Sequence, residues 1–231
     1  MHCFRDLDQL IDVLSKQIAG QLTAAISQNG HALLAVSGGS TPKPLFEKLS
    51  KINIAWQHVW VLLVDERWVD TRSADSNECL VRSALLKHCA KTARFMGLKS
   101  SQPSAHQAQR ACNLALQELP AKIDVLLLGM GDDGHTASMF PCADKKTLFQ
   151  ILDKKNVLRV MAVQPREAPH ERMSLTAAYL LTSGHRYLLM KGENKLATFK
   201  RALSGEGIMA MPIRVFLHQA GSELEVFYAA Q

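Results

Sequence analysis

The chain has 231 residues, of which 47% are hydrophobic and 21% are charged, as in soluble globular proteins with a substantial core. Its formal net charge is +6, but no run of Lys or Arg is longer than two residues. This charge favours a pocket for a small anion over a nucleic-acid surface. No apolar run approaches the ~18 residues that a membrane span needs, so we expect neither nucleic acid nor membrane as a partner.

The cysteines and histidines limit the classes of site. Five cysteines, an odd number without a C-x-x-C pair, are typical of a reducing compartment. The first residues carry acids and lack the apolar segment of a signal peptide, so we expect a cytoplasmic protein. The nine histidines form no H-x-H or HExxH pattern and pair with no Cys, so no metal site is expected.

Hydrophobic periodicity predicts helices and strands that alternate along the chain. Helices are predicted over residues 4–29, 42–51, from about 76, 105–119, 173–183 and 194–204. Strands are predicted over residues 31–37, 59–66, 123–131, 157–163, 185–192, 212–219 and 223–229. Apolar strands that alternate with helices indicate a mostly parallel sheet covered on both faces. We therefore predict a single α/β domain over residues 1–231, with a Rossmann-like sheet.

The first of three informative loops, SGGST, lies between a predicted strand and a predicted helix. Its residues are Ser37, Gly38, Gly39, Ser40 and Thr41. Pro42 follows and suits the first position of a helix. Glycines, hydroxyls and free amides at a helix start predict a phosphate site, although an ordinary capping turn uses similar residues. The loop lacks the patterns of a nucleotide-triphosphate site and of an esterase elbow.

The second loop places Asp65, Glu66 and Arg67 at the end of the strand predicted over 59–66. In a parallel sheet, ligands bind beyond the carboxyl ends of the strands. This strand end is therefore a suitable position for a catalytic or substrate-binding group. A salt-bridged strand terminus explains the same residues equally well.

The third loop, GMGDDGHTASMFP, begins with the G-x-G-x-x-G pattern of dinucleotide sites. Such a site needs a long helix after its third glycine, but Pro141 follows Gly134 by only seven residues. Asp132 and Asp133 would also place negative charge against a pyrophosphate. The required acid should end the next strand, whereas Asp153 precedes it. These three conflicts exclude a dinucleotide site.

The same loop carries Asp133 and His135 two residues apart. A carboxylate beside an imidazole fixes one tautomer and stabilises the imidazolium, which prepares a general base. A lone histidine is more often structural. The neighbouring acid, the flanking glycines and the position at a strand end favour catalysis.

Four stretches together resemble the 6-phosphogluconolactonase family. They are AVSGGSTPKPLFEKL, VLLVDERWV with SN at 76–77, VLLLGMGDDGHTASMFP, and ERMSLT at 171–176. The resemblance runs in register from about residue 30 to residue 204. The related glucosamine-6-phosphate deaminases have a glutamate before the proline of the third loop, where this chain has Phe140, and DEY-like residues in place of DERWV.

The resemblance implies hydrolysis of 6-phospho-D-glucono-1,5-lactone in the oxidative pentose phosphate pathway, without a cofactor. It assigns the phosphate to the SGGST loop with Arg172 and Lys195. It also implies that His135 activates water and that Asp133 orients the imidazole. Arg67 would face the oxyanion or the sugar hydroxyls, and Asp65 would bind hydroxyls. We expect a monomer or a weakly associated homodimer.

Two alternatives remain open at this point. One is a glucosamine-6-phosphate deaminase or isomerase on the same fold. The other is a sugar-phosphate sensor without turnover, although the chain leaves no room for a DNA-binding module. The tail EVFYAAQ departs from the family pattern, which usually has an Asp there, and we expect it to form an edge strand.

Overall fold

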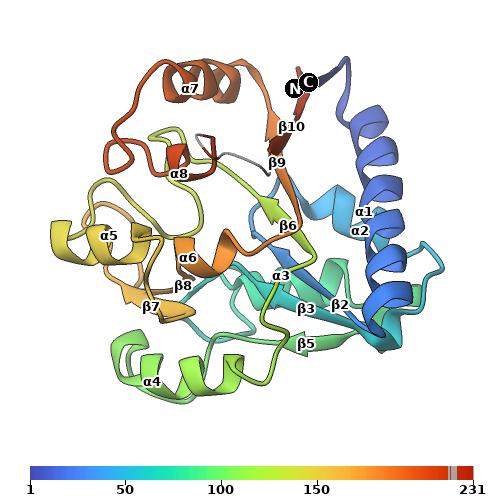
Figure 1. The fold of residues 1–231 in the computed structure, drawn as a ribbon, viewed down its shortest axis with the longest axis horizontal. Coiled ribbons are helices and arrows are strands. Elements are labelled where there is room, and N and C mark those ends of the chain that lie inside the picture. The colour runs from blue at the N-terminus through green and yellow to red at the C-terminus, as the bar shows by residue number, and fades with distance from the viewer. Residues whose placement is uncertain (218, 220–222, 231) are drawn as a thin grey trace.

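In the computed structural model, residues 1–217, 219 and 223–230 are described, and they form a seven-stranded and a three-stranded sheet with helices around them (Figure 1). The strands are β1 (His2–Phe4), β2 (Ala32–Val36), β3 (Val59–Leu63), β4 (Asp65–Arg67), β5 (Arg94–Met96), β6 (Val125–Leu128), β7 (Val160–Val163), β8 (Arg172–Leu175), β9 (His185–Lys191) and β10 (Leu224–Ala229). The helices are α1 (Leu7–Asn29), α2 (Lys43–Leu49), α3 (Asn77–Ala84), α4 (Ala105–Leu116), α5 (Lys145–Leu152), α6 (Ala177–Leu180), α7 (Glu193–Leu203) and α8 (Arg214–Leu217), with short 3-10 helices at Trp56–His58 and His88–Thr92.

The large sheet has the strand order β1-β10-β9-β6-β2-β3-β5, and its neighbouring strands all run parallel. The chain proceeds from β2 outward to β3 and β5, then returns to β6 and proceeds the other way to β9 and β10. The direction of the connections therefore reverses between β2 and β6. Such a switch point leaves a crevice at the carboxyl ends of the two strands, where ligands bind in open α/β sheets.

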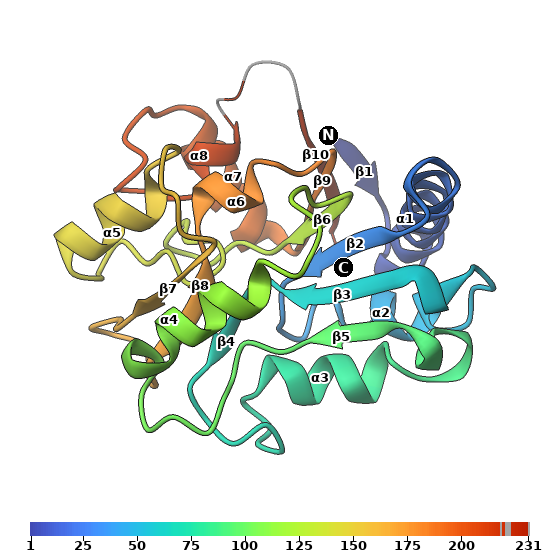
Figure 2. The ribbon, with the colours of Figure 1, turned by 60° about the horizontal axis from the view of Figure 1, so that its bottom comes forward.

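Helices cover both faces of the large sheet. On one face α1 packs against α2, and α2 packs against α3 (Figures 1 and 2). On the other side, Figure 1 shows α6, α5 and the small sheet, while α7 packs on β9. The buried strand β2 is fully apolar and inaccessible along its length, as a parallel strand covered on both faces should be. The predicted α/β fold class with a mostly parallel sheet is confirmed.

The small antiparallel sheet has the order β4-β8-β7 and changes two of the predicted elements. The strand predicted over 59–66 divides at Val64 into β3 and β4, and β4 leaves the large sheet to pair with β8. The helix predicted over 173–183 is wrong in its first half, because β8 takes Arg172–Leu175 and α6 covers only Ala177–Leu180. Pairing with β4, which is distant in sequence, decides this segment.

The strand predicted over 212–219 is wrong, because Arg214–Leu217 form α8; residue 218 lies outside the described part. A short apolar run does not distinguish a helix from a strand. Here the decisive contacts are those of the buried Arg214 guanidinium, which donates to the backbone carbonyls of Ala202, Gly207 and Arg201. These bonds hold the segment against the end of α7.

The tail is also placed differently from the prediction of an edge strand. β10 lies between β9 and β1, so both of its edges are hydrogen-bonded. The edge position belongs to β1, a segment of three residues that hydrophobic periodicity did not separate from the first helix. Phe227 of β10 is inaccessible to solvent and its ring packs against His2, Phe4 and Tyr187.

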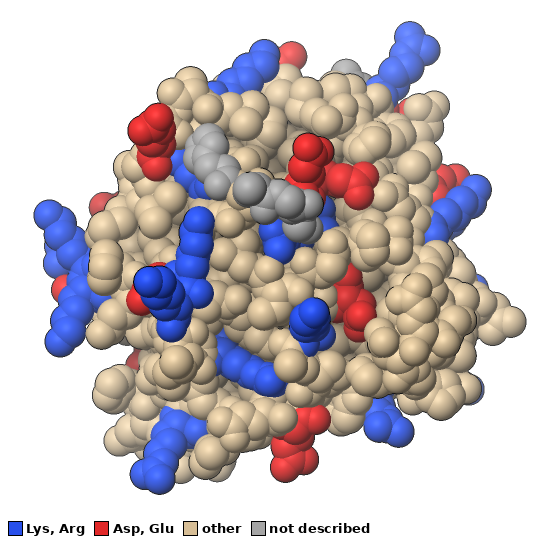
Figure 3. Space-filling model, in the orientation of Figure 1, with Lys and Arg blue, Asp and Glu red and all other residues tan. Residues whose placement is uncertain are grey.

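The described surface shows two features that bear on partners. Lys and Arg are scattered among acidic residues on the face in Figure 3 and form no continuous basic stripe there. Among the helices of the described residues, none is both long and apolar enough for a bilayer crossing.

Because β10 is internal, its aromatic side chain should contribute strongly to stability. We predict that Phe227→Ala lowers the free energy of unfolding by about 3–5 kcal/mol, as large-to-small core substitutions do. The matched control is Phe149→Ala on α5, whose side chain is 65% exposed and whose loss should cost about 0.5 kcal/mol or less. Urea unfolding curves measure both. Equal values for the two variants would contradict the internal position of β10.

Candidate active site

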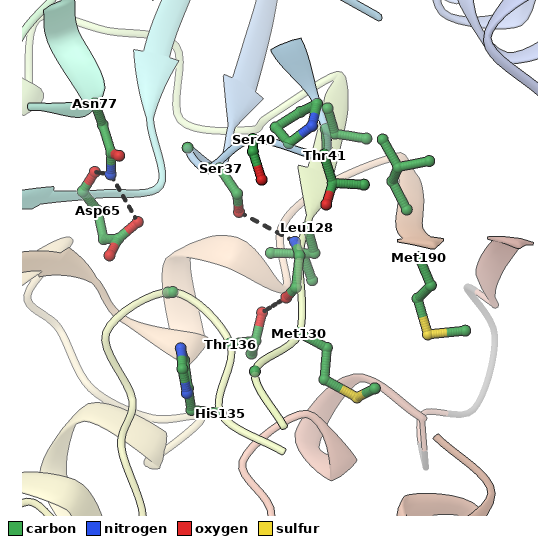
Figure 4. A pocket seen from close by; sticks show the side chains of 18 of the residues that line it. Ser37, Ser40, Thr41, Asp65, Asn77, Leu128, Met130, His135, Thr136 and Met190 are labelled. Carbon is green, nitrogen blue, oxygen red and sulfur yellow. Dashed lines mark hydrogen bonds between the residues drawn. The ribbon is translucent and has the colours of Figure 1, made fainter. Parts of the chain in front are cut away.

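A pocket of ≈ 350 Å³ lies at the switch point between β2 and β6. The loops after β2 and β6 line it, together with β4, the start of α3, the end of β9 and Lys195 of α7. Figure 4 shows His135 and Asp65 on one side of the pocket and Thr41 and Met190 on the other. Three loops predicted from the sequence thus meet in one cavity.

His135 and Asp133 form a hydrogen-bonded pair at this pocket. The imidazole Nδ1 lies 2.6 Å from Asp133 Oδ1, and the backbone N–H of His135 donates to the same oxygen at 3.0 Å. Partial burial opposes ionisation of Asp133, but these bonds outweigh it and hold the pKa of Asp133 below its ordinary value. An ionised carboxylate only accepts hydrogen bonds, so Nδ1 carries the proton and Nε2 is left as a base.

Two neighbours fix the orientation of the His135 ring. The ring of Phe140 lies 4.3 Å away between centroids and is tilted by 40°. Gly131 passes beneath the imidazole, and a Cβ built on it would lie 2.2 Å from His135 Nδ1 and 2.7 Å from Asp133 Oδ1. The backbone of Gly131 also donates to the His135 carbonyl at 2.8 Å. The second glycine of GMGDDGH therefore makes room for the pair.

The SGGST loop lies across the pocket from this pair, and Ser37 joins the two loops. Its hydroxyl accepts from the backbone N–H of Gly129 at 3.3 Å, and its N–H donates to the Leu127 carbonyl at 2.9 Å. Within the described residues, the backbone amides of 38–41 donate no hydrogen bond to the protein. Because the same residues line the pocket, these amides are candidate donors for an anion bound there.

Asp65 is nearly buried and is held from two sides. Its Oδ2 accepts from the Ser138 hydroxyl at 2.5 Å, while the Asn77 amide donates to its backbone carbonyl at 2.8 Å. The Asn77 side chain in turn lies against Gly38, where a Cβ would come within 1.9 Å of its Oδ1. Asp65 therefore joins all three loops.

Glu66 is inaccessible to solvent and does not form the salt bridge that its sequence position allowed. Its carboxylate accepts from the backbone N–H groups of Arg67, Asn77 and Glu78 and from the Ser76 hydroxyl, at 2.7–3.0 Å. Burial raises the pKa of Glu66, and the four hydrogen bonds oppose the shift. Glu66 thus fixes the start of α3 to β4, which positions Asp65 and Arg67.

The two predicted arginines are neighbours on β4 and β8, but only Arg67 lines the pocket. The Arg67 guanidinium donates to the Asp75 carbonyl at 2.6 Å. Arg172 is buried under the ring of Phe140, 5.8 Å from its centroid, and donates to the Pro169 carbonyl at 3.0 Å. Burial and the adjacent Arg67 lower the pKa of Arg172. Arg172 is therefore not among the described residues that line the pocket with the SGGST loop, and its role at the phosphate stays a prediction.

Lys195 does line the pocket together with the SGGST loop. Its ammonium forms an ion pair of 2.8 Å with Asp132 Oδ1. Lys191, at the end of β9, also contributes to the lining. Within residues 1–217, 219 and 223–230, no group of three or more His, Cys, Asp or Glu could hold a metal ion.

Residues 5–225 match the family described as Glucosamine-6-phosphate isomerases/6-phosphogluconolactonase. The chain is similar to the 6-phosphogluconolactonase of Pseudomonas aeruginosa, with 42% identity over 88% of this chain and 85% of the relative. It is similar to that of Mesorhizobium japonicum, with 41% identity over 99% of this chain and 94% of the relative. The crystal structure of a 6-phosphogluconolactonase from Shewanella baltica matches with a TM-score of 0.96 and 40% identity, over 99% of this chain and 97% of that chain. The chain belongs to this family.

Membership confirms the resemblance that the four motifs carried. The motifs alone predict no role for Asn77, Ser138 or Asp132, and they leave that of Glu66 open. Asn77 and Ser138 stand in matched motifs, but only the structure shows that both bind Asp65. Lys191 had no motif signal, because a lysine at the end of a strand is most often solvated.

Gly131 offers a test of the geometry around the base. We predict that Gly131→Ala lowers turnover by at least tenfold, because the new methyl group displaces the His135 ring from its position against Asp133. The control is Gly20→Ala on α1, where a Cβ meets nothing within 4 Å and turnover should be unchanged. Steady-state kinetics with circular dichroism measures both. Full activity of the Gly131 variant would refute the fixed ring position.

Proposed function

We propose that this protein hydrolyses 6-phospho-D-glucono-1,5-lactone to 6-phosphogluconate, the reaction of the oxidative pentose phosphate pathway that its relatives are named for. The observation that carries the proposal is the Asp133–His135 pair at the pocket, with Nε2 of His135 free to act as a base. The SGGST loop, with its unused amides, stands across the same pocket. A general base for ester hydrolysis and a site for an anion thus share one cavity.

The reaction proceeds without a covalent intermediate. His135 Nε2 removes a proton from water as the water oxygen attacks the lactone carbonyl, and Asp133 stabilises the resulting imidazolium. Arg67 stabilises the oxyanion or binds the sugar hydroxyls, and Asp65 accepts from hydroxyls. The imidazolium then gives its proton to the ring oxygen as the bond from the carbonyl carbon to that oxygen breaks. The products are a carboxylic acid and a sugar hydroxyl, so atoms and protons balance.

The phosphate binds at the SGGST loop and Lys195 in this proposal. The amides of residues 38–41 and the hydroxyls of Ser40 and Thr41 supply neutral donors, and Lys195 supplies charge. Arg172 was assigned to the same group by family resemblance. Arg172 is buried beside Arg67 and Phe140. This position supports an indirect role, in which Arg172 holds those two side chains in place beside His135.

The deaminase alternative requires an acid where Phe140 stands. Here the aromatic ring packs against His135, so no carboxylate reaches the base from that position. The sensor alternative predicts binding without consumption of the lactone. The oligomeric state, a monomer or a weakly associated homodimer, stays a prediction. The free thiols of all five cysteines support a reducing, cytoplasmic location.

The central test removes the base. We predict that His135→Asn lowers kcat by about 10²-fold or more, within the range for loss of general base catalysis. Loss of freshly prepared lactone is followed by NMR with wild-type protein, the variant and buffer alone, since the lactone also hydrolyses without an enzyme. If the wild-type protein does not exceed buffer, the lactonase proposal is refuted and the sensor or deaminase takes its place.

A second test addresses the phosphate. We predict that Lys195→Ala raises KM by about tenfold with little change in kcat, because it removes a charge-assisted hydrogen bond to a group that does not react. Lys200→Ala is the matched control, since Lys200 is exposed on the same helix and has no ion pair among the described residues. A normal KM with poor turnover in the Lys195 variant would contradict the assigned role.

A further inference from the structure

Lys195, the cation assigned to the phosphate, already forms an ion pair with Asp132, which lies in the same loop as His135. Asp132 Oδ1 lies 2.8 Å from Lys195 Nζ, and the side chains are 75% and 30% exposed, respectively. Asp132 immediately precedes Asp133, the partner of His135. Asp132 therefore places an acid between Lys195 and the Asp133–His135 pair.

The backbone of Asp132 is held by the same helix that carries Lys195. Its carbonyl accepts from the Thr198 hydroxyl at 3.2 Å and from the Arg201 guanidinium at 3.0 Å. Lys195, Thr198 and Arg201 are three residues apart, so they share one face of α7. Although the Asp132 carboxylate is exposed, these bonds keep it beside Lys195.

We propose that Asp132 determines how tightly the pocket binds phosphorylated ligands, by competing with their phosphate group for Lys195. This inference rests on the proposed phosphate site. A phosphate that binds Lys195 brings its negative charge to within a few ångströms of the Asp132 carboxylate. That separation is shorter than the screening length of about 8 Å at physiological salt, so the two groups repel. The carboxylate weakens the binding of substrate and of product, and it forms the ion pair with Lys195 again when either leaves.

Such weakening does not impair the chemical step. The phosphate does not react, so its binding energy lowers KM without raising kcat once substrate is abundant. Very tight phosphate binding would instead retain the phosphorylated product. Asp132 therefore favours release of the phosphorylated product, and its effect depends on both the phosphate and Lys195.

The test compares wild-type protein with Asp132→Asn, Lys195→Ala and the double variant. Asn keeps the size of the side chain and removes the charge. We expect Asp132→Asn to lower both the KM for the lactone and the inhibition constant of 6-phosphogluconate by about threefold to tenfold, while kcat stays equal or falls. In the Lys195→Ala background the same substitution should change neither constant. Glu193→Gln, which removes an exposed acid elsewhere on α7, is the matched control and should leave both constants unchanged.

Binding calorimetry separates this inference from the lactonase proposal. Titrations with 6-phosphogluconate and with gluconate, which lacks the phosphate, need no turnover. Tighter binding of 6-phosphogluconate alone supports competition by Asp132, even if the lactone is not consumed. Weaker binding in Asp132→Asn would mean that the carboxylate orients Lys195 and would overturn the inference. An equal change for both ligands, or an undiminished effect without Lys195, would overturn it as well.

Discussion

The pairing of β2 with β6 is the constraint on which the site depends. These parallel strands are neighbours in space but are separated by about 90 residues of chain, and the connections diverge from them in opposite directions. Their following loops must therefore leave the sheet side by side. Ser37 fixes this arrangement with hydrogen bonds to Leu127 and Gly129. The SGGST loop and the loop that carries His135 lie on the same pocket because the pairing of β2 with β6 places them next to each other.

The position of β4 beside the pocket depends on the buried carboxyl group of Glu66. The chain passes from β3 of the large sheet to β4 of the small sheet, so Asp65 and Arg67 reach the pocket from the small sheet. Burial of an isolated carboxylate costs several kcal/mol, and Glu66 meets four donors that offset this cost. An amide in its place accepts at only one of its two terminal atoms. The geometry of β4 thus depends on a buried carboxyl group that does not line the pocket.

The sequence predicted most of what local patterns control. The first helix ends at Gly30, whose φ of 75° suits glycine, and the Asp133–His135 pair is separated by a single residue. The sequence patterns missed α5, although Asp144 caps this helix locally. The other misses depend on contacts between distant segments. β8 forms because β4 pairs with it, and α8 is held by the contacts of Arg214 with the end of α7. The contacts of Arg172 with Phe140 and Pro169 were not predictable for the same reason, since a motif match fixes a residue type and not its neighbours.

Charge also explains why an anion-binding pocket contains so many acids. Hydrolysis turns a neutral ester into a carboxylic acid that ionises, so the product carries one more negative charge than the substrate. Asp65 lines the pocket and Asp133 binds the imidazole of His135 beside it, and repulsion from these two carboxylates acts on the new carboxylate of the product, which the lactone lacks. In the proposed mechanism, the cations bind the phosphate of both, while the acids favour release of the product. A pocket lined by cations alone would bind the substrate more tightly and release its product more slowly.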